Sequence, residues 1–241
     1  MRPPVVLLHG FLGRGADWRT VRERLSEAWD VRAPDLPGHG AAVGLGDDAY
    51  TMDGAAERVL AQLEKPVDLV GYSMGGRLAL HIAVTRPEAV RRLVLVSASP
   101  GLRTDVERAE RRALDADRAA EIAADLPAFV DRWYRMPLFD LPDDLRQRLT
   151  ADRTAHNDAA ELGRSLKGMG TGAQPGHWDA LAGIRAPTTA VAGARDAKFV
   201  RLAAAMAEAG PVAPVVVPDA GHLLPAERPA ALAQILTDTL T

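Results

Sequence analysis

The feature that most constrains this chain is a serine turn set between an apolar run and a helical segment. Residues 71–77 read GYSMGGR, and they follow the apolar run Val67 to Val70. Helix-forming residues continue to Arg86, so the pattern predicts a strand, a sharp turn and a helix. Glycines on both sides of Ser73 permit a tight turn and close approach of other backbone. The Ser73 hydroxyl is then exposed where the free N–H groups of the helix would stabilise a developing anion.

Short apolar runs alternate with helical segments along much of the chain. The runs are uninterrupted, which is typical of strands covered on both faces, and the alternation requires a parallel sheet with right-handed crossovers. We therefore predict an open α/β fold, with about six strands because little precedes the first run. The ligand site of such a fold lies outside the carboxyl ends of the strands, where Ser73 already stands. The expected strands are Val5–Leu8, Val31–Pro34, Val67–Val70, Leu93–Val96, Thr188–Ala192 and Val215–Val217, and the expected helices are Asp17–Ala28, Met52–Leu63, Arg77–Arg86, Phe199–Ala209 and Ala226–Leu240.

One long interval between two expected strands contains only helical patterns. Several of these patterns open with Thr, Asp or Asn in cap positions. We expect a helical insertion, residues 101–183, between two parts of one α/β core, residues 1–100 and 184–241. Such an insertion would cover the carboxyl edge of the sheet as a lid that excludes water. Its expected helices are Thr104–Ala124, Leu126–Tyr134, Asp143–Arg153 and Asn157–Met169.

The charge balance excludes several classes of partner. The chain has 29 basic and 32 acidic residues, a net charge of −3, so it lacks a field that would attract nucleic acid or an anionic membrane. Any anionic ligand must be held by particular arginines. The absence of cysteine removes disulfides, thiolate nucleophiles and cysteine-based metal sites. No run of about 18 apolar residues occurs, so we expect no membrane insertion and a cytoplasmic protein. We also expect a monomer or weak homo-oligomer that acts on a small molecule.

Two residues after later strands complete a chemical pattern with the serine. Asp196 follows the fifth expected strand and His222 follows the sixth, so both side chains are expected at the carboxyl edge, in the chain order Ser, Asp, His. A serine hydroxyl needs a base, and the base needs an orienting carboxylate. Asp196 also has a turn interpretation beside Arg195, and Asp219 is the alternative carboxylate.

The turn after the first strand supplies a second expected element of the site. Its bend would aim the Phe11 N–H at the pocket opposite the Met74 N–H, and two such donors form an oxyanion hole. For His9 we prefer a role in bracing this loop, because the donors would be backbone groups. His39, in the turn of residues 35–40 (DLPGHG), is likewise assigned to the scaffold.

These motifs together resemble the α/β-hydrolase fold, and more specifically the MenH family, the 2-succinyl-6-hydroxy-2,4-cyclohexadiene-1-carboxylate synthases of menaquinone biosynthesis. The resemblance covers nearly the whole chain. The motifs at residues 8–13 (LHGFLG) and 35–40 are shared across the superfamily and indicate only the fold. The discriminating motifs are GYSMGGR at 71–77, SASPGL at 97–102, WY at 133–134, PLF at 137–139 and SLKGMGTGAQP at 165–175.

The resemblance implies a set of site residues and a reaction. It places the catalytic triad on Ser73, Asp196 and His222, and substrate binding on Arg77, Arg111, Arg153, Trp133 and Tyr72. It implies no metal and no organic cofactor. The implied reaction eliminates pyruvate from 2-succinyl-5-enolpyruvyl-6-hydroxy-3-cyclohexene-1-carboxylate, whose three carboxylates suit planar guanidinium groups. Either Ser73 itself or His222 acting through Ser73 would be the base.

Two other functions use the same residues. A serine hydrolase, such as an esterase, a thioesterase or a carbon–carbon bond hydrolase, would use Ser73 as a nucleophile. A non-catalytic ligand-binding protein of the same fold is the third possibility, and the intact Ser, Asp, His pattern argues against it.

Overall fold

The computed structural model describes residues 2–63 and 66–241. Its centre is a six-stranded parallel sheet with the strand order β2-β1-β3-β4-β5-β6, which confirms the predicted fold class and strand number. The strands are β1 (Pro4–Leu8), β2 (Asp30–Arg32), β3 (Val67–Tyr72), β4 (Val90–Val96), β5 (Thr188–Gly193) and β6 (Val212–Val217).

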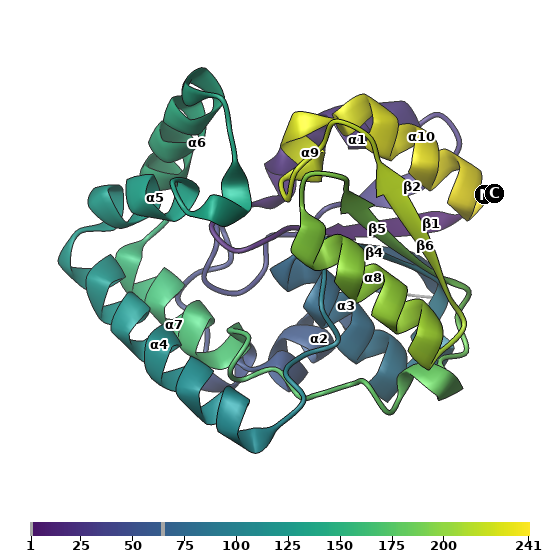
Figure 1. Cartoon of the computed structure of the whole chain (residues 1–241), viewed down its shortest axis with the longest axis horizontal. Helices are drawn as coiled ribbons and strands as arrows, with labels where there is room; N and C mark the ends of the chain where they lie inside the picture. Colours follow the sequence, from purple (N-terminus) through teal and green to yellow (C-terminus); the bar gives the residue numbers. More distant parts are fainter. Residues whose placement is uncertain (1, 64–65) are drawn as a thin grey trace.

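Helices cover both faces of this sheet (Figure 1). Alternate residues of the strands point to opposite faces, so Val5 and Leu7 pack with one set of helices and Val6 and Leu8 with the other. The first set is α1 (Arg19–Leu25) and α10 (Pro229–Leu240), and the second is α2 (Met52–Leu60), α3 (Met74–Thr85) and α8 (Ala197–Ala209).

The structure differs from the predicted elements at the sheet edges and at two helices. The second strand is the short edge strand β2, Asp30–Arg32 rather than Val31–Pro34, and both edge strands expose residues that we expected to be covered. Covering helices reach fully only over the central strands. The expected helix Ala226–Leu240 is divided into α9 (Leu224–Glu227) and α10, because Arg228 precedes Pro229 and leaves the helical conformation, with φ −138°. The expected helix Asp17–Ala28 is likewise a 3₁₀ turn, Gly15–Trp18, followed by α1.

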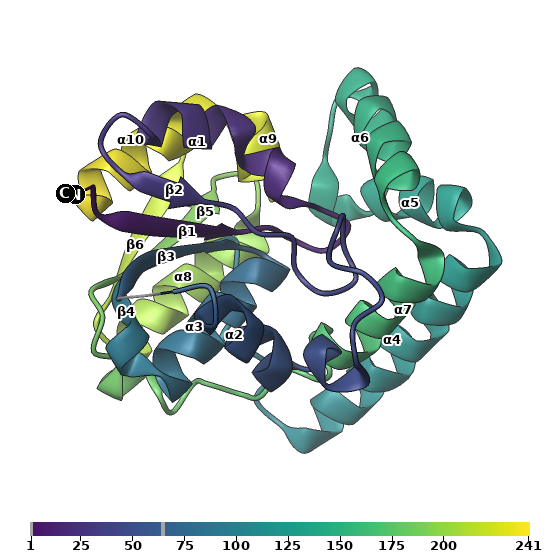
Figure 2. The same ribbon diagram turned by 180° about the vertical axis from the view of Figure 1, so that it is seen from behind.

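The expected helical insertion lies before the penultimate strand, β5. It contains α4 (Asp105–Ala124), α5 (Leu126–Tyr134), α6 (Asp143–His156) and α7 (Ala159–Met169). Figure 2 shows these helices standing off the carboxyl ends of the strands, with α4 beside α7 and α5 beside α6. Thr104, Asp125 and Asp158 cap α4, α5 and α7 by accepting backbone N–H bonds. Of the residues that open the expected helices, Thr104 is the predicted cap that is confirmed, whereas Asp143 is already inside α6 and Asn157 precedes the cap of α7.

Polar contacts fasten the end of α6 to the loop after β1. The Arg153 guanidinium lies 2.6 Å from Asp17 Oδ1, and the Arg14 guanidinium lies 2.6 Å from Asp152 Oδ1. The Asn157 amide donates to the Leu12 carbonyl at 3.0 Å. The insertion is therefore held against the same loop that carries Phe11.

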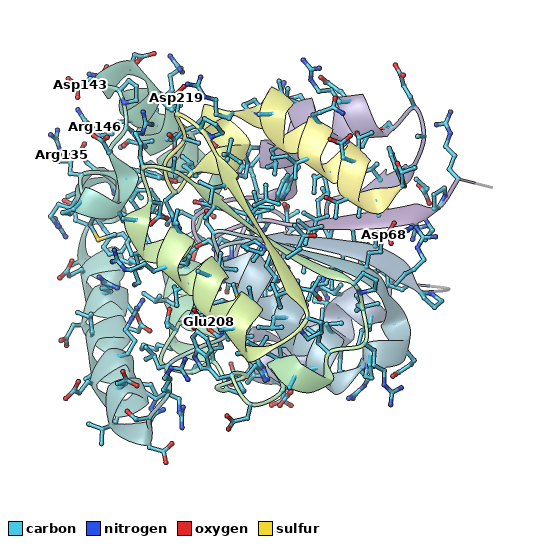
Figure 3. All side chains as sticks on the ribbon, turned by 45° about the vertical axis from the view of Figure 1, so that its right-hand side comes forward. Asp68, Arg135, Asp143, Arg146, Glu208 and Asp219 are labelled. Carbon is cyan, nitrogen blue, oxygen red and sulfur yellow. The ribbon has the colours of Figure 1, made fainter. Side chains whose placement is uncertain are left out.

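At the amino ends of the strands, on the side of the sheet away from the insertion, a buried carboxylate lies close to both ends of the chain. Asp68 of β3 is fully buried and accepts from Arg91 Nε at 2.8 Å, with Arg92 Nη1 3.8 Å away (Figure 3). Arg92 also donates to the Thr241 carbonyl at 3.0 Å. Within residues 2–63 and 66–241, no helix is both long and apolar enough to cross a bilayer.

Two buried histidines brace the loop after β1, as predicted for His9 and His39. His9 Nε2 accepts the Leu36 N–H at 2.9 Å, and His39 Nε2 accepts the Leu12 N–H at 3.2 Å. Burial lowers the pKa of His9 to about 4 and the pKa of His39 to about 3. Both rings are therefore neutral at pH 7, which is the form that can accept these backbone donors.

The neutral histidines predict a stability loss in acid. Their folded pKa values lie below the unfolded value, near 6.5, so their contribution is complete above about pH 6.5 and falls as the pH drops toward 4 and then 3. Each histidine would change the free energy of unfolding by up to about 1.4 kcal/mol per pH unit in this window. Urea unfolding from about pH 7.5 to about pH 4.5 measures this slope.

The matched control is His39→Gln, whose side-chain oxygen can still accept the Leu12 N–H but does not titrate. We expect this variant to show a flatter dependence of stability on pH than the parent. Identical pH slopes for the two proteins would show that His39 is not a source of the acid sensitivity.

Candidate active site

The turn between β3 and α3 holds Ser73 in a strained conformation, with φ +51° and ψ −109°. The turn is tight because Gly71 and Gly75, on either side of Ser73, have no side chains. A Cβ on Gly75 would lie 2.3 Å from the Leu8 carbonyl oxygen, and one on Gly71 would lie 2.2 Å from the Gly75 oxygen. Only glycine fits these positions, and the result is a serine directly before the N-terminus of α3, as the sequence predicted.

A hydrogen-bonded chain joins the serine to the two residues predicted with it. His222 Nε2 lies 3.3 Å from Ser73 Oγ, and His222 Nδ1 lies 2.7 Å from Asp196 Oδ2. Asp196 Oδ1 also accepts the Phe199 N–H at 3.2 Å, which fixes the carboxylate at the start of α8. Since a carboxylate only accepts, Nδ1 carries the proton and Nε2 is free to accept the serine proton. This geometry can activate Ser73 as a nucleophile or as a base.

The alternative carboxylate, Asp219, does not take part in this chain of hydrogen bonds. It lies exposed in the turn after β6 (Figure 3). Asp196 and His222 are 6% and 2% exposed, so their contact is shielded from water. Asp196 is therefore the partner of His222. In the described residues, no group of three or more His, Asp or Glu side chains is arranged to hold a metal ion.

A cavity opens beside Ser73, under the insertion. Phe11 and Met74, whose N–H groups were predicted as anion donors, both line it together with His222. Its other apolar walls come from the insertion and from α8, and they include Trp133, Leu138, Leu166 and Phe199. Trp133 packs edge-on against Phe11, with ring centroids 5.3 Å apart. The predicted residues Phe11, Met74 and Trp133 are thus gathered around Ser73.

Arg77 brings a buried positive charge into this cavity. It is 9% exposed, and its Nη1 donates to the Met169 carbonyl at 2.8 Å and to Gln174 Oε1 at 3.4 Å. Both acceptors are neutral, and within residues 2–63 and 66–241 no carboxylate lies in ion-pair distance of Arg77. Burial and then the neighbouring Arg111 lower the pKa of Arg77 to about 10, which still leaves it charged at pH 7. A buried cation in this state favours an anionic ligand.

Arg111 supplies a second positive charge from the insertion. It lines the same cavity and pairs with Asp115 through Nε, at 2.8 Å. Asp115 also lies 3.8 Å from Arg118, so one carboxylate faces two arginines. The cavity beside Ser73 therefore carries a net positive charge in a protein whose overall charge is −3.

The structure places two predicted substrate residues, Arg153 and Tyr72, in a neighbouring cavity. Phe11 lines both cavities, whereas Arg153 and Tyr72 line only the second one. Arg153 is 4% exposed and already pairs with Asp17 and Asp152, at 2.6 and 2.7 Å. Tyr72 packs beside the His222 ring at 5.6 Å, and burial raises its pKa well above 10, so its hydroxyl is neutral. Their contact with substrate stays a prediction.

Three residues at or behind the cavity were not assigned as site residues from the sequence, although Ser97 and Gln174 lie in the motifs at 97–102 and 165–175. Lys198 and Ser97 line the cavity, and buried Gln174 stands behind Arg77, donating to the Ser99 carbonyl at 3.0 Å. Ser97 directly follows β4 and has φ +48°. Lys198 had a usable signal, because it lies two residues after Asp196 and so must lie close to the carboxyl edge. Gln174 lies in the motif at 165–175, but its contact with Arg77 could not be predicted, since it joins residues far apart in the chain.

Comparisons with known proteins agree on one family. A family model described as the alpha/beta hydrolase family matches residues 5–235. A protein of Bacillus subtilis (strain 168), provisionally named 2-succinyl-6-hydroxy-2,4-cyclohexadiene-1-carboxylate synthase, is 38% identical over 98% of this chain and 90% of its own length. The synthase of the same name from Escherichia coli O1:K1 / APEC is 35% identical over 97% of this chain and 94% of its own.

A solved structure gives the same result for the fold. The structure of MenH from S. aureus matches with a TM-score of 0.92 and 31% identity, over 99% of this chain and 93% of that chain. The parallel sheet and the helical insertion before β5 are consistent with this match. The chain therefore belongs to the alpha/beta hydrolase family and, within it, to the MenH family of 2-succinyl-6-hydroxy-2,4-cyclohexadiene-1-carboxylate synthases.

Proposed function

We propose that this protein is a lyase that eliminates pyruvate from 2-succinyl-5-enolpyruvyl-6-hydroxy-3-cyclohexene-1-carboxylate, in menaquinone biosynthesis. The product is 2-succinyl-6-hydroxy-2,4-cyclohexadiene-1-carboxylate, the compound named in its relatives. One observation of the site carries the proposal: Arg77 and Arg111 place positive charge beside Ser73, and only Asp115 compensates it among the described residues. A substrate with three carboxylates supplies the missing negative charge.

The mechanism begins with removal of the ring proton next to the succinyl carbonyl. Ser73 takes this proton while His222 accepts the serine proton at Nε2, and Asp196 stabilises the resulting imidazolium. The electron pair moves onto the carbonyl oxygen, where the Phe11 and Met74 N–H groups would donate to it. Return of the pair through the ring breaks the bond from carbon 5 to the enolpyruvyl oxygen. Pyruvate leaves as its enolate and takes up a proton.

The insertion serves as a lid in this mechanism. Trp133, Leu138 and Phe199 form apolar walls beside Ser73, and Arg111 links the insertion to the anionic substrate. Elimination needs no water, so apolar walls that exclude water beside Ser73 favour it over hydrolysis. We also infer that the protein acts in the cytoplasm on a small anionic substrate, without nucleic acid or membrane insertion. We infer further that it is a monomer or weak homo-oligomer, which size-exclusion chromatography would test.

The alternative function is a serine hydrolase with Ser73 as the nucleophile, because the hydrogen-bonded geometry serves both reactions. The buried, carboxylate-free Arg77 favours the lyase, since a neutral ester would leave that charge without a partner. A purely ligand-binding role would leave Ser73 inert. Labelling of Ser73 by a fluorophosphonate separates that role from both enzymes.

Substitution of the catalytic residues tests the proposed roles. We expect Ser73→Ala to lower turnover by at least about a thousandfold without loss of folding, because triad residues act as a unit. Asp196→Asn should also be severe, since it no longer holds His222 in the useful tautomer. Asp219→Asn is the matched control and should keep normal turnover. Pyruvate release by Ser73→Ala within about tenfold of the parent would disprove the assignment.

Substitution of the cavity arginines tests the anion site. We expect Arg77→Ala and Arg111→Ala each to weaken transition-state binding by about 2 to 4 kcal/mol, with lysine restoring only part of it. Arg103 is the control, because it stacks on Trp178, 3.8 Å from the ring centroid, and does not line the cavity. Equal kcat/KM values for the alanine variants of all three would contradict a polycarboxylate site.

Isotope labelling separates elimination from hydrolysis. In ¹⁸O-labelled water the elimination leaves no solvent oxygen in the ring product, whereas discharge of an acyl-enzyme requires one. We also expect neutral short-chain esters to be hydrolysed with kcat/KM lower by several orders of magnitude, because they cannot use the arginines. Mass spectrometry of the ring product gives the result. Obligatory label uptake, or ester hydrolysis that rivals pyruvate release, would favour the hydrolase.

A further inference from the structure

We propose that Lys198 is the third cation of the catalytic cavity and binds one carboxylate of the substrate. The proposal rests on the proposed function and adds a residue to its binding site. Lys198 lines the same cavity as Ser73, Arg77 and Arg111. The three cations come from three different elements, α8, α3 and α4, which are labelled in Figure 1.

The position of Lys198, which is exposed and whose ammonium group lies 5.6 Å from the Phe199 ring centroid, is slightly unfavourable for a cation. It is the second residue of α8, whose N-terminus carries the positive end of the helix dipole. Throughout the described chain, no carboxylate lies within 4.0 Å of its ammonium group, and Asp196 is committed to His222 and the Phe199 N–H. The helix itself therefore disfavours a cation here. A bound carboxylate at the cavity would remove this repulsion.

The choice of lysine is itself unusual in this chain. Only three of its 29 basic residues are lysines, the others being arginines. Arginine is used for the paired positions, such as Arg111 with Asp115 and Arg153 with Asp17. Lys198 is instead exposed at the cavity rim, where a flexible point charge can follow a carboxylate as it enters.

The placement of Arg153 leaves the role of third cation open. Its guanidinium lies in the neighbouring cavity and contacts two carboxylates, so it has no free positive charge for a third. A third positive group in the cavity beside Ser73 would suit a substrate with three carboxylates. Among the residues that line the cavity beside Ser73, the positive side chains are Arg77, Arg111 and Lys198.

A rim lysine should act on binding and association, and not on the chemical step. It would hold the substrate equally in the ground state and the transition state, so its removal raises KM and leaves kcat nearly unchanged. Because the contact is exposed, salt should weaken it. These properties distinguish Lys198 from the buried Arg77, whose loss should lower kcat as well as kcat/KM.

The experiment compares Lys198→Met, Lys198→Glu and Lys198→Arg with Arg201→Met, an exposed charge removal on the same helix outside the cavity. KM is measured with the tricarboxylate substrate, and 2-succinylbenzoate, an aromatic analogue of the proposed ring product that carries two of the three carboxylates, is titrated by calorimetry. We expect KM to rise about five- to tenfold for Lys198→Met, more for Lys198→Glu and little for Lys198→Arg, with the difference shrinking at high salt. A parallel rise in Kd for the probe assigns Lys198 to a ring or succinyl carboxylate, and an unchanged Kd assigns it to the enolpyruvyl carboxylate. Arg201→Met should bind as the parent does.

Stability provides an independent readout. Removal of a cation from the first turn of α8 should keep or raise Tm, so weaker binding by Lys198→Met or Lys198→Glu cannot be a consequence of unfolding. The inference is overturned if Lys198→Met and Arg201→Met match within about twofold in both Kd and KM. If the parent protein neither binds the probe nor releases pyruvate, both the proposed function and the role of Lys198 are overturned. Normal pyruvate release by the parent with a neutral Lys198→Met overturns only the role of Lys198.

Discussion

The close approach of the α3 backbone to the ends of the central strands is the constraint on which the candidate site depends. A Cβ on Gly75 would meet the Leu8 carbonyl oxygen at 2.3 Å, and a Cβ on Gly76 would meet the Ala98 side chain at 2.5 Å. The first turn of α3 therefore packs closely between the end of β1 and the residues that follow β4. Ser73, the Met74 N–H and Arg77 all belong to this turn or to the first turn of α3, so one packing contact positions the base, an anion donor and a cation together.

Backbone strain in this protein is concentrated at the carboxyl edge of the sheet. In the described residues, the positive-φ positions other than glycine are Leu12, Ser73, Ser97 and Asp219, which follow β1, β3, β4 and β6. Such conformations cost on the order of 1–3 kcal/mol each and persist only where surrounding contacts impose them. Here those contacts are the buried central strands and the hydrogen bond from Leu12 to His39. The stable part of the fold thus supports a strained edge where the chemistry is proposed.

Sequence patterns predicted the elements whose signal is local and missed the features that depend on tertiary pairing. Ser73, Asp196 and His222 could be placed because parallel strands bring their carboxyl ends to one edge, and the structure joins the three by hydrogen bonds. The exposed edge strands could not be recognised, since an apolar run does not reveal how far the covering helices extend. The sequence also did not reveal that Arg153 lines the neighbouring cavity and not the one beside Ser73. That position depends on its pairing with Asp17, which is distant in the chain. Lys198 carried a positional signal, but its isolation from carboxylates emerged only from the packing.

Both ends of the chain lie at the amino edge of the sheet, where Arg92 donates to the Thr241 carbonyl and β1 begins at Pro4 (Figure 1). The candidate site faces the other way, beyond the carboxyl ends of the same strands. A surface linker or a fused enzyme attached at either end would therefore leave the cavity mouth unobstructed. The proximity of the ends also means that a short peptide could join them, so that the chain could be reopened in an exposed loop without crossing the sheet. The chain ends, where another molecule can be attached, therefore lie on the opposite side of the sheet from the candidate site.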